Sequence, residues 1–199
     1  CLSVSLSVTP FLTPCKNADS ACLLASAKKA LPYVTAGAPD LGLPSLDPMV
    51  IEQAASREAG LVLDMTDTTV KGLKNCEVLN LNRRSRLVGT SLIISLVTGD
   101  IVVKIQLETA DVVRDGDTYW KVASWKHTTD VLTNVHFNFQ NLFNGNQQAS
   151  DTIHQFANSN WKEIYLEVAP PVTTAVVTKI VKAIEKMFEV VPVKEITLD

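Results

Sequence analysis

Histidine is scarce in this 199-residue chain, and the setting of its three histidines excludes the common catalytic and metal-binding patterns. His127, His136 and His154 form no H-E-x-x-H motif and no i, i+4 pair. No serine stands in a G-x-S-x-G turn, and no glycine-rich phosphate loop occurs. His136 falls on the polar phase of a predicted strand, which favours a solvated side chain. The sequence therefore predicts a protein that is not an enzyme and needs no metal or cofactor.

An excess of basic charge is also lacking, because 18 Lys and Arg stand against 21 Asp and Glu and the net charge is −3. Nucleic acids and anionic membranes are bound through a basic face, so neither is a predicted partner. One tight basic cluster, Arg83-Arg84-Ser85-Arg86, is interpreted as the solvated end of a hairpin. A phosphate-binding patch is the alternative interpretation of this cluster.

Long hydrophobic runs are missing as well. None reaches the roughly 18 to 20 residues that a membrane span needs, so stable membrane insertion is not predicted. Residues 1–12 are apolar, rich in serine and uncharged, which is typical of the remnant of a secretory signal. An N-terminal strand or arm is the alternative. Residues 13–199 contain no internal repeat and no linker, which favours one domain.

Cysteine is limited to Cys1, Cys15, Cys22 and Cys76. No pair has the C-x₂₋₄-C spacing of a zinc site, which argues against a four-cysteine metal site. Six residues separate Cys15 from Cys22, so these two are close enough to bridge across one turn. Such a bridge would stabilise the fold by about 2–3 kcal/mol and would imply an oxidising compartment. Cys1 and Cys76 have no local partner.

Hydrophobic residues are abundant, at 46 % of the chain, and they follow clear periods. Residues 18–31 have helical spacing, with Asp19 or Ser20 as the cap, and Pro32 is expected to limit the helix. The proline- and glycine-rich segment from Gly37 to Pro48 predicts an extended loop.

The middle of the chain alternates with a period of two, which predicts a meander of long antiparallel strands. Arg114-Asp115-Gly116-Asp117 is a strong turn signal between two of them. The alternating stretches begin near Ala59 and cover residues 61–66, 101–108 and 131–140.

After Asn144-Gly145-Asn146 the period returns to 3.6, with Ser150 or Asp151 near the cap. One helical element, kinked at Pro170-Pro171, is expected over about 38 residues, or close to 57 Å. Its broad apolar stripe needs a cover of matching length, which half-apolar strands wrapped around it would provide. The periodicity thus predicts an α+β fold, either with a filled core or with an elongated cavity for a ligand.

Four motifs occur in order along the chain. They are Cys15-x₆-Cys22-Leu23 before a helix ending at Leu31-Pro32, the loop Gly37 to Pro48, Val70-Lys-Gly-Leu73, and Asn141-Leu-Phe-Asn-Gly-Asn146 followed by Asn158-Ser-Asn-Trp161. With these motifs the chain resembles the takeout and juvenile-hormone-binding family of insect secreted proteins, and the takeout branch in particular. The resemblance runs from about Cys15 to the end.

The resemblance implies a long C-terminal helix wrapped by a curved, highly bent antiparallel sheet that encloses an elongated hydrophobic tunnel, related to the TULIP-type lipid-binding folds. It implies a Cys15–Cys22 disulfide, secretion into haemolymph or another extracellular fluid, and transport of juvenile hormone, a fatty acid or a similar long-chain lipid by a monomer. One departure is that the segment between Gly72 and Gly99 is short by about one hairpin. This puts closure of the sheet in doubt there.

The alternative function is a protein- or membrane-docking module with an exposed apolar surface and no closed tunnel. A lipid esterase is a third hypothesis, which no nucleophile–base pair supports. The strand faces and the helix stripe give the candidate ligand-binding residues, which are Leu63, Met65, Ile105, Leu107, Val135, Phe137, Phe139, Phe156, Ile164, Val168, Val172, Val176, Ile180 and Met187.

Overall fold

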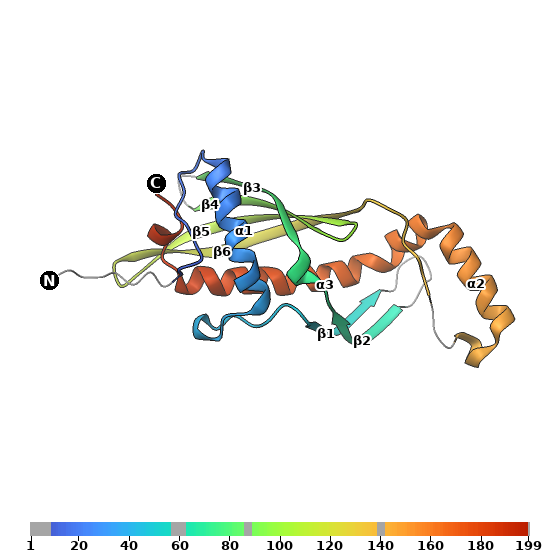
Figure 1. Ribbon diagram of the computed structural model, residues 1–199. Helices are drawn as coiled ribbons and strands as arrows, with labels where there is room; N and C mark the ends of the chain where they lie inside the picture. The colour runs from blue at the N-terminus through green and yellow to red at the C-terminus, as the bar shows by residue number, and fades with distance from the viewer. Residues whose placement is uncertain (1–8, 57–62, 86–88, 139–141, 199) are drawn as a thin grey trace.

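A long helix, α3 (Trp161–Val190), runs lengthwise through the molecule between two antiparallel sheets (Figure 1). The computed structural model describes residues 9–56, 63–85, 89–138 and 142–198. A four-stranded sheet with the order β3-β4-β5-β6 covers one side of α3, and a two-stranded sheet, β1-β2, lies on another. The helix contacts both sheets, through β6 and β1. The predicted wrapping of a long helix by strands is therefore confirmed.

Helix α1 (Ser20–Ala36) begins where the sequence predicts, because the Asp19 carboxylate accepts a hydrogen bond from the backbone N–H of Cys22 at 2.9 Å. The expectation that Pro32 limits the helix is wrong, since α1 continues one further turn. In that turn the Thr35 hydroxyl donates to the backbone carbonyl of Leu31 at 2.9 Å. Gly37, with a φ of 84°, then ends the helix.

The loop after α1 is irregular except for a short 3₁₀ turn, η1 (Pro39–Leu41). It leads into β1 (Met49–Ser56), which pairs with β2 (Leu63–Val70) in the register Met49 to Val70. Sequence periodicity did not predict β1. Of the alternating residues 61–66, positions 61 and 62 lie outside the described residues.

The larger sheet consists of β3 (Glu77–Ser85), β4 (Thr90–Thr98), β5 (Ile101–Arg114) and β6 (Asp117–Val131), and a 3₁₀ turn, η2 (Leu73–Asn75), precedes it. The predicted turn joins β5 to β6, with positive φ at Asp115 and Gly116 as a two-residue hairpin turn requires. Ile105 and Leu107 are fully buried on the predicted face of β5.

The strand predicted over residues 131–140 is wrong, because β6 ends at Val131 and residues 132–138 are irregular. In place of a neighbouring strand, the side chain of Asn158 pairs with the backbone of this segment. The backbone N–H of Phe137 donates to Asn158 Oδ1 at 2.7 Å, and Asn158 Nδ2 donates to the Phe137 carbonyl at 3.0 Å. Positions 139 and 140 lie outside the described residues.

The C-terminal helical region is two helices rather than one kinked element. A 3₁₀ segment, η3 (Leu142–Gly145), precedes α2 (Gln147–Ser159), whose cap is Asn146 and neither Ser150 nor Asp151. The break between α2 and α3 falls at Asn160, which is non-helical, whereas Pro170 and Pro171 lie inside α3. Helix α2 therefore turns away at the end of the molecule opposite the termini (Figure 1).

Helix α3 is also the one helix among the described residues that is long and apolar enough to cross a membrane, by length and composition alone. In this fold it packs against strands, and Val177, Ile180, Val181, Ala183 and Phe188 are buried on it. At 30 residues it is roughly 45 Å long.

The two ends of the described chain meet beside α1. Cys15 pairs with Thr197 in a parallel bridge, close to the last 3₁₀ turn, η4 (Val193–Glu195). Phe11 is buried and stacks on Tyr33 with ring centroids 4.8 Å apart. Residues 9–12 thus pack on the body of the protein, while the proposal that residues 1–12 are a signal remnant stays a prediction.

Candidate ligand cavities

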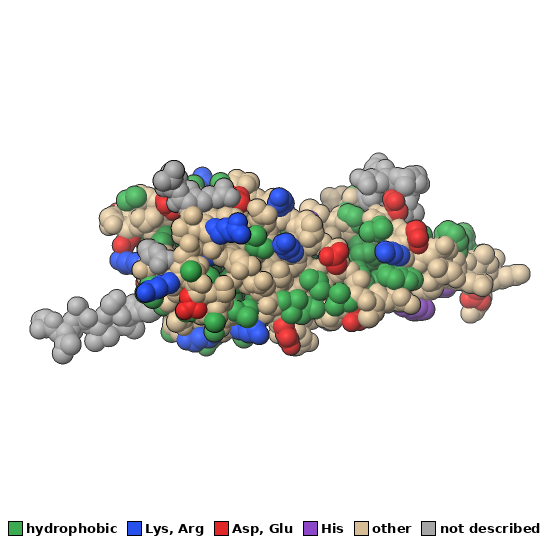
Figure 2. Space-filling view, turned by 90° about the horizontal axis from the view of Figure 1, so that it is seen from above, with side chains coloured by type: hydrophobic (Ala, Val, Ile, Leu, Met, Phe, Trp, Pro, Cys, Tyr) green, Lys and Arg blue, Asp and Glu red, His purple; other side chains and the backbone are tan. Residues whose placement is uncertain are grey.

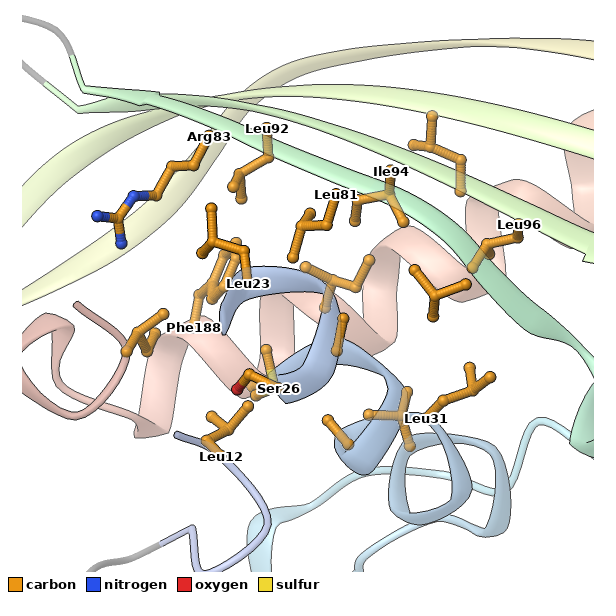
Figure 3. Close-up of a pocket in the computed structure, with 18 of the residues that line it drawn as sticks. Leu12, Leu23, Ser26, Leu31, Leu81, Arg83, Leu92, Ile94, Leu96 and Phe188 are labelled. Atoms are coloured by element: carbon orange, nitrogen blue, oxygen red, sulfur yellow. The ribbon is translucent and has the colours of Figure 1, made fainter. Parts of the chain in front are cut away.

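A cavity of about 170 Å³ lies between α1, the strands β3 and β4, and the C-terminal half of α3 (Figure 3). Its wall is almost wholly aliphatic and aromatic. The residues that line it are Leu12, Thr13, Leu23, Ser26, Ala27, Ala30, Leu31, Val34, Val78, Leu81, Arg83, Leu92, Ile94, Leu96, Ile105, Trp120, Ile180, Ile184, Met187, Phe188 and Ile196.

Local periodicity explains how α1 and β3 form this wall. The lining residues of α1 recur at helical spacing from Leu23 to Val34, so one face of the helix covers the cavity. In β3 the register shifts between Val78 and Asn80. The shift brings Val78 onto the same face as Leu81 and Arg83, although even and odd positions of a regular strand point to opposite faces.

Polar groups are confined to Thr13, Ser26 and Arg83. Arg83 is 5 % exposed; its Nη2 donates to the Cys15 carbonyl at 3.2 Å and its Nε to Asn17 Oδ1 at 3.3 Å. The Ser26 hydroxyl donates to the Thr13 carbonyl. The interpretation of the basic cluster as a solvated hairpin end is therefore wrong for Arg83, because its side chain lies on the face of β3 that lines the cavity.

A second cavity of about 190 Å³ lies further along α3. Its wall contains Cys76, the free cysteine among the described residues, which is buried. Burial raises the pKa of the Cys76 thiol, and hydrogen bonding with Thr98 opposes this only in part, so the thiol stays protonated at neutral pH. The residues that line this cavity are Val70, Lys71, Leu73, Cys76, Leu96, Thr98, Ile101, Val103, Val172, Thr173, Val176, Val177 and Ile180.

The family model of haemolymph juvenile hormone binding protein (JHBP) matches residues 1–87 and 93–198. This chain belongs to the JHBP family. It is 25 % identical over 224 residues to the circadian clock-controlled protein daywake of Drosophila melanogaster. This alignment covers 92 % of this chain and 86 % of daywake. The crystal structure of Epiphyas postvittana Takeout 1 superposes with a TM-score of 0.81 at 28 % identity, covering 94 % of this chain and all of the other. The resemblance to takeout and JHBP proteins is confirmed, and so is the α+β fold with a long C-terminal helix packed against antiparallel sheets.

The predicted disulfide is present, since Cys15 and Cys22 are bonded with their Cα atoms 5.8 Å apart. The expected shortening between Gly72 and Gly99 stays a prediction. The family match breaks within this segment, at residues 88–92. Strand β3 pairs directly with β4 here.

Five of the fourteen candidate residues line a cavity. Ile105 and Met187 line the first, Val172 and Val176 line the second, and Ile180 lines both. Leu107 belongs to the buried core, and Met65 is partly buried against it. The Leu63 side chain and Phe139 lie outside what the structure describes.

The other candidates do not line either cavity, for two structural reasons. Val135 and Phe137 belong to the irregular segment that Asn158 holds, so they are not on a strand face. Phe156 is 57 % exposed because α2 leaves the body at Asn160. Ile164 and Val168, on the first turns of α3, are half-buried outside both cavities.

Sequence reasoning missed the contribution of α1, β3 and β4. The spacing of Leu23, Ala27 and Leu31 predicted the helix, and the same stripe could have been assigned to the cavity. No alternation in β3 could reveal Val78 and Leu81 together, because the bulge interrupts the period.

None of the three histidines lines either cavity. His127 is half-buried beside Trp125, with ring centroids 5.9 Å apart, and burial lowers its pKa. Within the described part of the chain, no group of three His, Cys, Asp or Glu side chains could hold a metal ion. The walls of both cavities are mostly apolar.

Proposed function

We propose that this protein is a secreted carrier that binds a small hydrophobic ligand in the cavities along α3. The observation that carries the proposal is the first cavity, which is lined by α1, the sheet and α3 and is apolar apart from three residues. Small-molecule sites are concave, mostly apolar and equipped with a few placed polar groups. Membership of a family named for juvenile hormone binding supports the same function.

We expect the ligand to be juvenile hormone, a fatty acid or a similar long-chain lipid, with one part of the molecule in the first cavity. An apolar cavity of about 150 Å³ can stay dry and bind benzene, so a cavity of about 170 Å³ accepts a comparable apolar group. Each methylene buried contributes roughly 0.8 kcal/mol, against association costs of roughly 4–15 kcal/mol. Thr13, Ser26 and Arg83 would orient the polar end of an amphipathic molecule.

Transport between tissues through haemolymph or another extracellular fluid is the setting we propose for this binding. The disulfide supports secretion, because such bonds persist in oxidising compartments. The carrier would act as a monomer.

Filling the first cavity tests the proposal. Ala27 lines it from α1, whereas Ala25 is exposed on the same helix. Ala27→Phe should reduce binding of a fluorescent long-chain fatty acid at least tenfold, because the ring occupies the ligand volume. Overpacking should cost about 1–3 kcal/mol of stability. Ala25→Phe, the matched control, should bind as wild type does.

Extraction of the purified protein followed by mass spectrometry gives a second readout. We expect a co-purified lipid with wild type and Ala25→Phe and a reduced amount with Ala27→Phe. Absence of any lipid, together with equal probe affinity in all three proteins, would rule out this cavity as the carrier site.

A second candidate function is docking to a membrane or protein through exposed apolar side chains. Phe143, Phe156 and Leu166, at the end of the molecule that carries α2, are all more than half exposed. Figure 2 shows hydrophobic side chains gathered on one face toward that end. Co-sedimentation with phosphatidylcholine vesicles, lost in Phe156→Ser and retained in Ala27→Phe, would support docking; equal sedimentation of all variants would count against it.

A further inference from the structure

Two side chains belong to both cavities. Leu96, from β4, and Ile180, from α3, line the first cavity and also the second. Both are nearly buried, at 9 % and 8 % exposure. Both belong to the same buried core cluster, and both lie where the lining of one cavity passes into the lining of the other.

The order of lining residues shows that the cavities lie end to end. Along α3, residues 172–180 line the second cavity and residues 180–188 line the first. Along β4, Leu92, Ile94 and Leu96 line the first, and Leu96 and Thr98 line the second. Helix α3 and strand β4 thus place the two cavities in the same order, and the lining residues of α3 span roughly 24 Å of the helix axis.

The polar end of the first cavity lies away from Leu96. Arg83 pairs with Leu92 in the β3–β4 register, while Leu96 pairs with Val78 at the other end of the strand pair. Figure 3 shows Arg83 and Ser26 on the side of the cavity opposite Leu96. A ligand whose polar group lies near Arg83 would therefore direct its apolar tail toward Leu96 and Ile180.

We propose that Leu96 and Ile180 form a partition that determines the length of ligand this carrier accepts. The proposal rests on the carrier function above. A short ligand occupies the first cavity and leaves the partition in place. A longer ligand displaces both side chains and extends its tail into the second cavity, whose wall there is built from Val103, Val176, Val177 and Cys76.

The energetics favour a threshold in chain length. Each methylene added within an open cavity gains burial, so affinity rises steadily while the chain fits. Displacing two packed side chains opposes binding once the tail reaches them, because cores resist rearrangement. Affinity should then level off for intermediate chains and rise again only when the second cavity fills.

A pair of leucine truncations on β4 tests the partition. Leu96→Ala removes half of it, whereas Leu92→Ala deletes the same atoms from a buried leucine that lines the first cavity alone. Octanoic and stearic acid would be compared by displacement of a fluorescent lipid. Leu96→Ala should raise the preference for stearic over octanoic acid at least tenfold, and Leu92→Ala should leave that ratio within about twofold of wild type.

Two further measurements remain valid even if Leu96→Ala folds poorly. Val176→Trp fills the second cavity only, so it should lower the affinity for stearic acid at least tenfold and leave the affinity for octanoic acid unchanged. In wild type, saturating stearic acid should slow alkylation of the Cys76 peptide by iodoacetamide more than saturating octanoic acid does. Peptide mapping by mass spectrometry separates Cys76 from Cys1.

The outcomes distinguish the two proposals. If neither acid binds any variant, the carrier function fails and the partition with it. A different result would overturn the partition and leave the carrier function standing. In that result both acids bind, Leu96→Ala and Leu92→Ala change the stearic-to-octanoic affinity ratio equally, and Val176→Trp lowers the affinity for both acids alike.

Discussion

At the scale of single residues, His127 gives the stability of the protein a dependence on pH. It lies half-buried on β6 beside Trp125, and burial lowers its pKa. As pH falls below the unfolded value of about 6.5, the unfolded chain takes up the proton more readily than the folded one, so stability declines. His127 thus contributes to stability that is present above that pH and is lost as pH falls through the lowered pKa.

We predict that His127→Gln weakens this pH dependence. The drop in the urea midpoint between about pH 7.5 and about pH 5.5 should be smaller in the variant than in wild type. His136→Gln, at an exposed position, should keep the wild-type drop. Neither change should alter fatty acid affinity more than a few-fold, because neither residue lines a cavity. If His127→Gln retained the full wild-type drop, other groups would be its cause.

Cys15 and Cys22 provide a second prediction at the residue scale. Their bond ties the segment before α1 to its first turn. Replacing both with Ala should lower the free energy of unfolding by about 2–3 kcal/mol, since a short loop is no longer closed in the unfolded chain. Urea denaturation with and without reductant measures this. The double variant should not respond to reductant, and an equal response in both proteins would assign the effect elsewhere.

At the scale of elements, Asn158 connects α2 to the segment that follows β6. Its amide accepts from the Phe137 N–H and donates to the carbonyls of Phe137 and His154. Asn158→Ala should cost about 1–3 kcal/mol of stability and accelerate hydrogen exchange at the Phe137 amide. Asn158→Asp keeps the acceptor, so exchange there should remain slow while stability falls by less. Fast exchange in both variants would show that the acceptor does not hold this segment.

The same segment shows what sequence periodicity could and could not predict. Alternation over 101–108 gave the buried face of β5, because Ile105 and Leu107 meet a continuous core. Equally clear alternation over 131–138 gave no strand, because the Phe137 backbone pairs with the side chain of Asn158, 21 residues later in α2. Periodicity shows which faces are apolar, but it does not show whether the backbone will pair with another strand or with a side chain.

The break between α2 and α3 illustrates a related limit. Two adjacent prolines predicted the interruption at residue 170, yet α3 continues through them and the chain bends at Asn160. The bend removes Phe156 from the interior and leaves the candidate residues of α3 beyond Val168 to line the cavities. The family motifs were the better guide to the fold, because they reflect the whole arrangement rather than one local preference.

At the scale of the whole molecule, α1, both sheets and α3 all contribute to the walls of the cavities. Empty apolar volume leaves its lining without contacts on one side, which costs stability in proportion to its size. A ligand restores those contacts in the folded state only. Cavity occupancy and global stability should therefore change together.

We accordingly predict that delipidated protein is less stable than protein saturated with a long-chain fatty acid. A ligand that binds only the folded state stabilises it by about 2.7 kcal/mol at a free concentration a hundred times the Kd. The unfolding temperature should rise with the logarithm of ligand concentration once the Kd is exceeded. Ala27→Phe, with its first cavity filled, should show little of this rise, while Ala25→Phe should match wild type. A rise of equal size in Ala27→Phe would mean that the stabilising ligand lies outside the first cavity, whereas a flat response in wild type would contradict binding to the folded protein.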